Sequence, residues 1–161
     1  MDQQTQFYDL DADPHVPREH RMVSRLYRYW LRARGNRPYP ALTDMNPDSL
    51  PGSWPHRFVL RAADDGELRI VDVGASVIGD CAVDVGGRAQ SDIPGDCLLG
   101  VGLLHCRQVL DSGKPLSWGG RYLSRRNVSV SYRSIVLPLS GNGQKIDALF
   151  GAANGKQADP A

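Results

Sequence analysis

Three consecutive segments near the end of the chain decide its fold: LSWGGRYL (Leu116–Leu123), VSVSYRSIVL (Val128–Leu137) and KIDALFGA (Lys145–Ala152). In the second segment, Val128, Val130 and Tyr132 alternate with polar residues. This two-residue period is typical of an antiparallel strand with one face buried and the other in water. The turn residues 141–143 (GNG) separate the second segment from the third. We therefore predict three antiparallel strands whose apolar face is covered by helices.

The size and composition of the chain indicate one globular domain. Of its 161 residues, 41% are apolar and 23% are charged, as in ordinary soluble proteins. The net charge of +1 provides no general attraction to nucleic acid or to a membrane surface. The chain begins without the basic flank and apolar run of a signal peptide, and no stretch reaches the about 20 apolar residues that span a bilayer. We expect a cytoplasmic protein that does not bind membranes.

The three cysteines, Cys81, Cys97 and Cys106, are an odd number without the spacing of a disulfide framework. We expect them to be free, buried thiols in a reducing compartment. Since no Cys-x-x-Cys pair is present, the sequence does not favour a zinc site built from the cysteines and His105. We therefore predict no metal ligands.

The two ends of the chain lack the patterns of packed elements. Residues 1–17 have no apolar period, and we expect a flexible N-terminal arm. Residues 154–161 follow the last predicted strand, and we expect a disordered tail. The folded domain is then predicted to cover residues 18–153.

A helix is predicted over residues 18–34, because apolar residues recur there at helical spacing before Gly35. Its opposite side carries a row of arginines, which is typical of the solvated face of an amphipathic helix. The apolar stripe is broad enough to pack on the sheet and also to meet a second copy of the protein. We expect a homodimer with Leu26, Tyr29 and Trp30 at its interface.

The middle of the chain supplies a hairpin and a covering helix. Five prolines within residues 36–55 favour an extended surface path. Alternating residues on either side of the turn at residues 64–66 predict two paired strands. Residues 79–94 show no period, and we expect short helical turns and loops there. Asp96 is the expected N-cap of a helix over Cys97–Leu110.

This succession of one helix, two strands, short helices, a longer helix and three antiparallel strands is similar to that of PAS domains. Three phrases, YWLRARG (Tyr29–Gly35), LTDMNP (Leu42–Pro47) and VLPLS (Val136–Ser140), resemble stand-alone single-PAS-domain proteins of the alphaproteobacterial type. The resemblance covers about Arg18 to Ala153, and the chain departs from the group's pattern between Ile70 and Ile93.

The resemblance implies an α+β fold: a PAS-like five-stranded antiparallel sheet with helices over one face and an N-terminal helix. It also implies a ligand-sized interior, dimerisation through the N-terminal helix, and a role in signal perception or in contact with a signalling protein. We expect a small apolar or aromatic ligand at most, because the inward side chains are too large to leave room for haem or flavin, and we predict no cofactor. The candidate pocket residues are Leu99, Leu103, His105, Trp118, Tyr122, Val130 and Tyr132.

Two alternatives differ from this signalling module in kind. An enzyme would use the same cavity, with His105 as acid or base and Tyr132 or Trp118 shaping the pocket. A nucleic-acid-binding protein would use the arginines of the N-terminal helix. The sequence contains no Gly-x-Ser-x-Gly, no His-Glu-x-x-His and no obvious carboxylate pair. We therefore predict a non-catalytic sensory or regulatory module with no catalytic residues.

Overall fold

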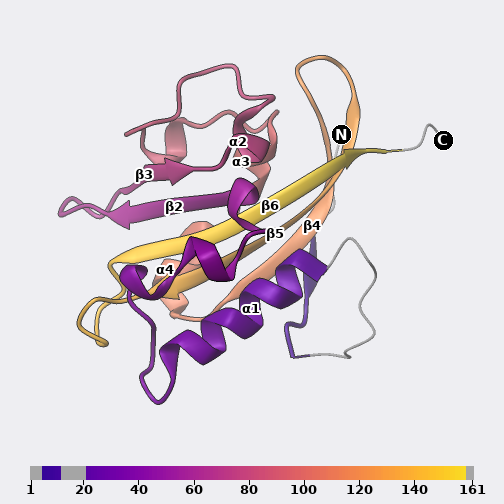
Figure 1. Cartoon of the computed structure of the whole chain (residues 1–161). Helices are drawn as coiled ribbons and strands as arrows, with labels where there is room; N and C mark the ends of the chain where they lie inside the picture. The colour runs from indigo at the N-terminus through magenta and orange to yellow at the C-terminus, as the bar shows by residue number, and fades with distance from the viewer. Residues whose placement is uncertain (1–4, 12–20, 159–161) are drawn as a thin grey trace.

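The three strands predicted near the end of the chain form the centre of a six-stranded antiparallel sheet in the order β1-β4-β5-β6-β2-β3 (Figure 1). The structure is a computed structural model that describes residues 5–11 and 21–158. Among these residues, the helices and strands are β1 (Gln6–Tyr8), α1 (Arg21–Arg34), β2 (Arg57–Ala62), β3 (Leu68–Val73), α2 (Ala75–Ile78), α3 (Leu98–Gly102), α4 (Cys106–Ser112), β4 (Leu116–Leu123), β5 (Ser129–Leu139) and β6 (Ala148–Gln157). Short 3₁₀ helices lie at Leu42–Asp44, Pro47–Ser49, Trp54–His56 and Gln90–Asp92.

The sixth strand comes from the segment that we predicted to be a flexible arm. Gln6–Tyr8 pairs with β4, with Phe7 opposite Trp118. The prediction is therefore wrong for this part of the arm, while residues 1–4 and 12–17 lie outside the described residues. A three-residue edge strand is bound mainly through its backbone, so it needs no apolar period that a sequence could reveal.

The C-terminal boundary is also later than predicted. β6 continues to Gln157 and pairs with β5 from Ala148 to Gln157. The expected disordered tail over residues 154–161 is therefore wrong as far as residue 157, and residues 159–161 lie outside the described part. The polar end of β6 gave no apolar signal, because only its other half lies in the core.

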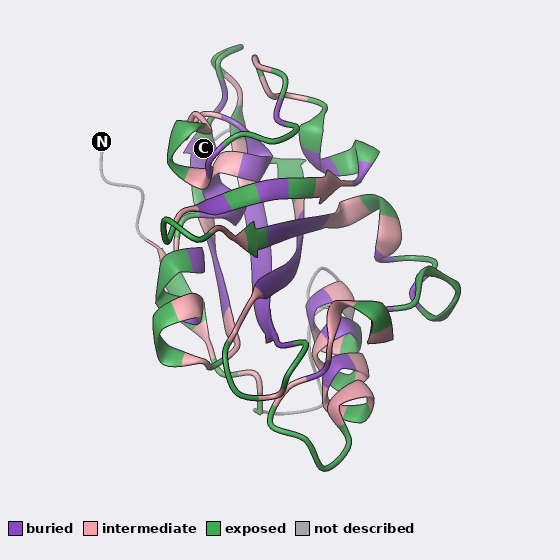
Figure 2. Cartoon of the chain, turned by 90° about the vertical axis from the view of Figure 1, so that its left-hand side faces the viewer, coloured by how far each residue is buried: buried purple, intermediate pink, exposed green. Residues whose placement is uncertain are grey.

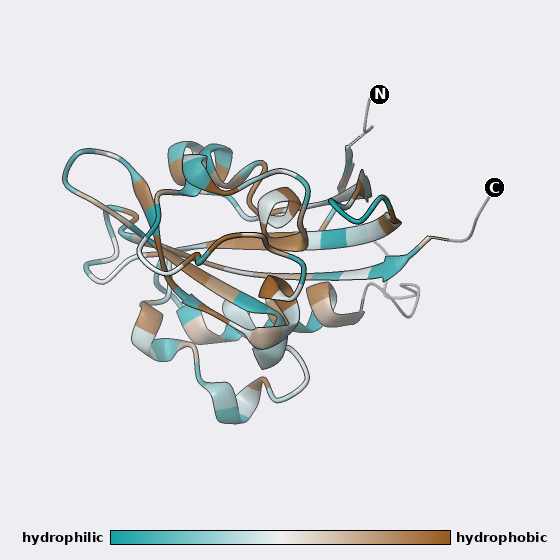
Figure 3. Cartoon of the chain, turned by 90° about the horizontal axis from the view of Figure 1, so that it is seen from above, coloured by the Kyte–Doolittle hydropathy of each residue, from teal (hydrophilic) through white to brown (hydrophobic). Residues whose placement is uncertain are grey.

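Helices pack against both faces of the sheet, whereas we predicted helices over one face only (Figures 2 and 3). Figure 2 shows buried residues along the central strands. On one face, α2, α3 and α4 pack over a core that contains Trp118 and Tyr132. On the other face, α1 packs over Ile135 and Leu137. The continuous apolar run at the end of β5 fits burial on both faces.

The helix α1 lies on its own sheet and does not present its apolar stripe to solvent. Leu26 is fully buried and Trp30 is 2% exposed, and the Trp30 indole Nε1 donates a hydrogen bond to the Pro138 carbonyl oxygen at 2.9 Å. These two residues are therefore unavailable as the dimer contacts that we predicted. Tyr29 is half-buried, and its hydroxyl donates to the Asp44 carbonyl oxygen at 2.6 Å. Residues 18–20 of the predicted helix lie outside the described residues.

The predicted helix over Cys97–Leu110 is divided into α3 and α4. Asp96 does not cap α3, since the N-cap position is Cys97 and its side chain makes no capping bond. Glycines allow α3 to approach the sheet closely: a Cβ on Gly102 would lie 3.1 Å from the Ala153 Cβ. The left-handed Gly113, with φ of 70°, ends α4. Residues 79–94 form the expected turns and loops with one short 3₁₀ helix at Gln90–Asp92.

Candidate functional site

The structure brings the predicted pocket residues together, but their side chains pack as a core. Trp118 and Leu99 are fully buried. The polar atoms of this cluster bond within the protein: the Trp118 indole Nε1 donates to the Val101 carbonyl oxygen at 3.1 Å, and the Tyr122 hydroxyl donates to the Asp80 carboxylate at 2.6 Å. Burial raises the pKa of Tyr122, and the hydrogen bond to Asp80 raises it further. The cluster also includes Leu103 and Tyr132, with Val130 packed against it.

His105 lies between two aromatic rings at the N-cap of α4. Its ring centroid is 4.8 Å from that of Phe7 and 5.1 Å from that of Trp118. Burial lowers the pKa of His105, which favours the neutral imidazole. Its Nε2 is buried and has no hydrogen-bond partner among the described residues. Because it packs between these two rings, His105 is a structural residue at the edge of the core.

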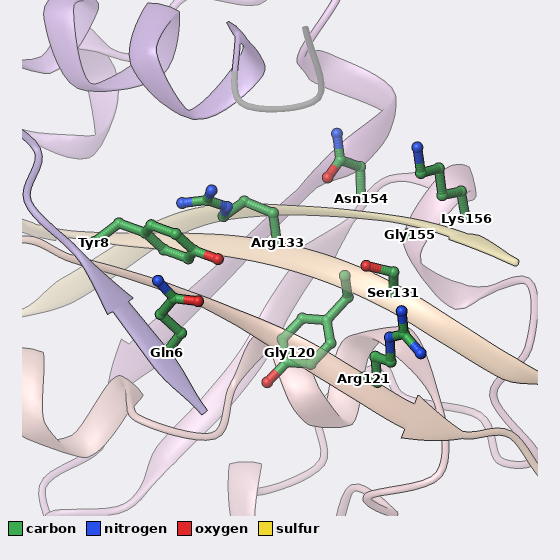
Figure 4. A pocket seen from close by; sticks show the side chains of 10 residues that line it. Gln6, Tyr8, Gly120, Arg121, Ser131, Arg133, Asn154, Gly155 and Lys156 are labelled. Carbon is green, nitrogen blue, oxygen red and sulfur yellow. The ribbon is translucent and has the colours of Figure 1, made fainter. Parts of the chain in front are cut away.

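An open groove lies on the opposite face of the same strands (Figure 4). It has a volume of about 360 Å³. Three cationic side chains come from three neighbouring strands: Arg121 from β4, Arg133 from β5 and Lys156 from β6. The register places Arg121 opposite Ser131, and Ser131 opposite Lys156. The remaining described lining residues are Gln6, Tyr8, Gly120, Tyr132, Asn154 and Gly155.

The groove depends on the edge strand β1. Tyr8 reaches across Gly119, where an added Cβ would lie 3.3 Å from the Tyr8 ring. The guanidinium carbon of Arg133 then lies 3.0 Å from the centre of the Tyr8 ring, an arrangement in which the aromatic face attracts the cation. Arg133 is only 5% exposed. The aromatic ring and the sheet therefore hold this guanidinium at a fixed place in the groove wall.

The lining chemistry favours a negatively charged ligand. Guanidinium and ammonium groups are hydrogen-bond donors that match carboxylate and phosphate oxygens. The described lining residues also include the amide side chains of Gln6 and Asn154, and none of them is Asp, Glu or His. Among the described lining residues, a hydroxyl nucleophile such as Ser131 therefore has no carboxylate or imidazole base beside it. The arrangement is suited to binding an anion.

Sequence reasoning missed most of this groove. The alternation in β5 does place Ser131 and Arg133 on one face, but the signal does not show which residues of other strands join them. Tyr8 and Gln6 lie in the segment that we predicted to be a flexible arm, and Asn154 and Lys156 lie in the predicted tail. The groove residues come from both ends of the chain, which only the strand order brings together.

Comparisons with known proteins give little information about the family of this chain. No protein-family model matches it, and no curated protein matches it. One similar solved structure is described as that of an RNA-binding light-oxygen-voltage receptor, with 14% sequence identity and a TM-score of 0.46 over 95% of this chain. This chain spans 39% of that receptor's chain. At this level of similarity we draw no argument from the receptor.

None of the described helices has the length and apolar content needed to cross a bilayer.

Proposed function

We propose that this protein is a non-catalytic, PAS-like regulatory module. The observation that carries this proposal is the succession of elements. An N-terminal helix is followed by the β2–β3 hairpin, short helical turns, the α3–α4 cover and the three strands β4, β5 and β6. This is the succession for which the sequence resembles PAS domains. Fold-level analogy supports a role in signalling but does not identify a ligand.

The ligand that the site supports best carries a carboxylate or phosphate group and binds in the groove of Arg121, Arg133 and Lys156. The groove is open to solvent on the sheet, whereas the predicted apolar pocket is occupied by side chains such as Trp118 and Leu99. A ligand there would touch three strands at once. Binding there would change the surface of the sheet that a signalling partner contacts.

A homodimer remains part of this proposal, although not through Leu26 and Trp30, which are buried in the protein's own core. Light scattering of the full chain tests it. A mass that stays monomeric at high protein concentration would contradict the dimer and leave the ligand proposal unaffected.

Native mass spectrometry of the freshly purified protein, together with its absorption spectrum, tests the ligand proposal. We expect a small non-covalent adduct that is reduced in an Arg121→Gln variant. Arg125→Gln is the matched control, because Arg125 is exposed in the turn between β4 and β5 and does not line the groove. An adduct held equally by both variants would contradict binding in the groove. A Soret or flavin absorption band would contradict the expectation that the protein holds no haem or flavin.

Nucleic acid is a second candidate ligand, favoured by one observation on α1. Arg25, Arg28 and Arg32 are exposed, and together with Tyr29 they line a surface hollow of about 290 Å³. A row of cations can follow a phosphate backbone. Retention of RNA or DNA through purification, with binding that falls steeply as salt rises, would support this second candidate over the regulatory module.

A further inference from the structure

Two of the three cysteines meet outside the groove, although 16 positions separate them in the sequence. Cys81 follows α2, and Cys97 is the N-cap residue of α3. Their Sγ atoms are 2.8 Å apart. Cys81 is half-buried, and Cys97 is buried. The third cysteine, Cys106, is buried in α4 and is not part of this pair.

The separation of the sulfurs decides between two chemistries for this pair. The Asp80 carboxylate lies near both thiols, with the three candidate ligand atoms within 4.8 Å of one another, so a metal is one option. A tetrahedral zinc ion with Zn–S bonds of about 2.3 Å holds two sulfurs about 3.8 Å apart. A disulfide bond is about 2.05 Å long. The observed 2.8 Å is closer to the disulfide, and a small movement of either side chain would close it.

We propose that Cys81 and Cys97 are a redox modification site that forms a reversible intramolecular disulfide when the protein meets a peroxide. Disulfides in reducing compartments are usually transient and redox-sensing. The pair has the features of such a site: one cysteine is partly exposed, and the sulfur of the other lies in direct contact with its sulfur. This site is independent of the ligand groove proposed above.

The reaction needs only the two thiols and one hydrogen peroxide. One thiol of the pair loses its proton, and the resulting thiolate attacks one peroxide oxygen, so that an S–O bond forms, the O–O bond breaks and the departing hydroxide takes up that proton as the first water. The sulfur of the other cysteine then attacks the resulting sulfenic sulfur, the S–S bond forms, and the second water leaves. The two thiols lose two protons and two electrons in total, and the peroxide is reduced to two waters. The hydrogen bond from the Cys81 thiol lowers the pKa of Cys97, which favours the thiolate form of that sulfur.

The new bond would reinforce a corner that Asp80 already organises. One Asp80 oxygen accepts a hydrogen bond from the Leu98 backbone N–H at 3.0 Å, and the other accepts from the Tyr122 hydroxyl at 2.6 Å. These bonds connect the loop after α2 to α3 and to β4. A disulfide between Cys81 and Cys97 would close the loop of residues 81–97 beside these contacts. We therefore expect the oxidised protein to melt at a higher temperature than the reduced protein.

The test uses the full chain, reduced and then treated with hydrogen peroxide. Remaining thiols are alkylated, and the protein is digested with trypsin under non-reducing conditions. Cleavage after Arg88 separates the two cysteines into different peptides, so a linked pair is detected directly. We expect a Cys81–Cys97 link with the loss of two hydrogens, a rise in melting temperature, and reversal of both by dithiothreitol. Tandem fragmentation distinguishes Cys97 from Cys106, because both lie in one tryptic peptide.

Two variants sharpen the test. Cys81→Ser should abolish both the link and the rise in melting temperature, while Cys106→Ala should retain them. If Cys106→Ala does not fold, the disulfide mapped in the unmodified protein decides by itself whether Cys81 and Cys97 form the pair. A link that involves Cys106, or oxidation of Cys81 to a sulfinic acid without a link, would overturn the proposal. Protection of both thiols from peroxide by added zinc, with one ion bound per chain, would also overturn it in favour of a metal site.

Discussion

The two faces of β4 and β5 differ in burial and in chemistry. On one face, Trp118 and Tyr132 are buried in the core under α3 and α4. On the other face, Arg121 and Arg133 line an open polar groove. The same strands supply both sets of residues, since neighbours in a strand point to opposite faces. A residue's place in a strand therefore decides whether it lies in the apolar core or lines the polar groove.

The largest expected effect comes from removing residues 1–34. The deletion takes away both β1 and α1, and it uncovers the apolar face that contains Ile135, Leu137 and Phe150. Exposed apolar patches of this kind lead to association. We expect an aggregated product, measured by light scattering. A stable, monomeric truncated protein would show that this face does not need its helix.

Trp118→Ala should strongly destabilise the protein, because this side chain is fully buried and its Nε1 bonds to the Val101 carbonyl oxygen. We expect a loss of about 3–5 kcal/mol in the free energy of unfolding, measured by denaturant titration. Arg121→Ala is the matched control on the other face of the same strand, and we expect a change within about 0.5 kcal/mol. Similar losses in both variants would remove the distinction between the two faces.

Much of this contrast could be predicted from the sequence, and the reasons differ between the two faces. Alternation of apolar and polar residues correctly placed Trp118, Tyr122 and Tyr132 together, because burial leaves a local pattern in each strand. Whether the side chains enclose a cavity or fill the space depends on packing, which no local pattern records. The sequence accordingly predicted that large side chains occupy much of the interior, but it did not show how much space they leave for a ligand.

The groove was harder to predict, because it depends on contacts between distant segments. Tyr8 and Lys156 are almost a chain length apart, and only pairing of β1 and β6 with the central strands brings them to one place. The short edge strand contributes mainly backbone hydrogen bonds and carries no apolar period. The stripe of α1 was predicted to pack on its own sheet and also to meet a second copy, but an apolar stripe does not show which of its residues the sheet covers, and Leu26 and Trp30 are among those covered.

A smaller effect is expected for Gly119→Ala, which acts on the groove without touching its cations. The added Cβ would lie 2.7 Å from the Tyr132 carbonyl oxygen and 3.3 Å from the Tyr8 ring. The Tyr8 ring should move away from Arg133, and the protein should lose about 1–3 kcal/mol of stability. Tyrosine fluorescence and denaturant titration measure the two changes. An unaltered Tyr8 environment would contradict its position across Gly119.

The smallest effect concerns pH and His105. Burial lowers the pKa of this imidazole in the folded state, so the unfolded chain takes up the proton first as the pH falls. Its contribution to stability is therefore complete above the unfolded pKa of about 6.5 and declines below it. We expect the free energy of unfolding to change less between pH 7.5 and pH 5.5 in a His105→Leu variant than in the unmodified protein. An equal pH dependence in the two proteins would contradict the buried, neutral imidazole.

The most direct test of the central claim is a titration of the full chain with inorganic phosphate, followed by the NMR chemical shifts of its backbone amides. If the polar face is the binding face, shifts should concentrate at Arg121, Arg133 and Lys156. The Arg121→Gln variant should bind about tenfold more weakly, because one charge-assisted hydrogen bond is lost, and Arg125→Gln should bind as the unmodified protein does. Shifts centred on Leu99 and Leu103, or binding that is unchanged in Arg121→Gln, would contradict the assignment of binding to the groove.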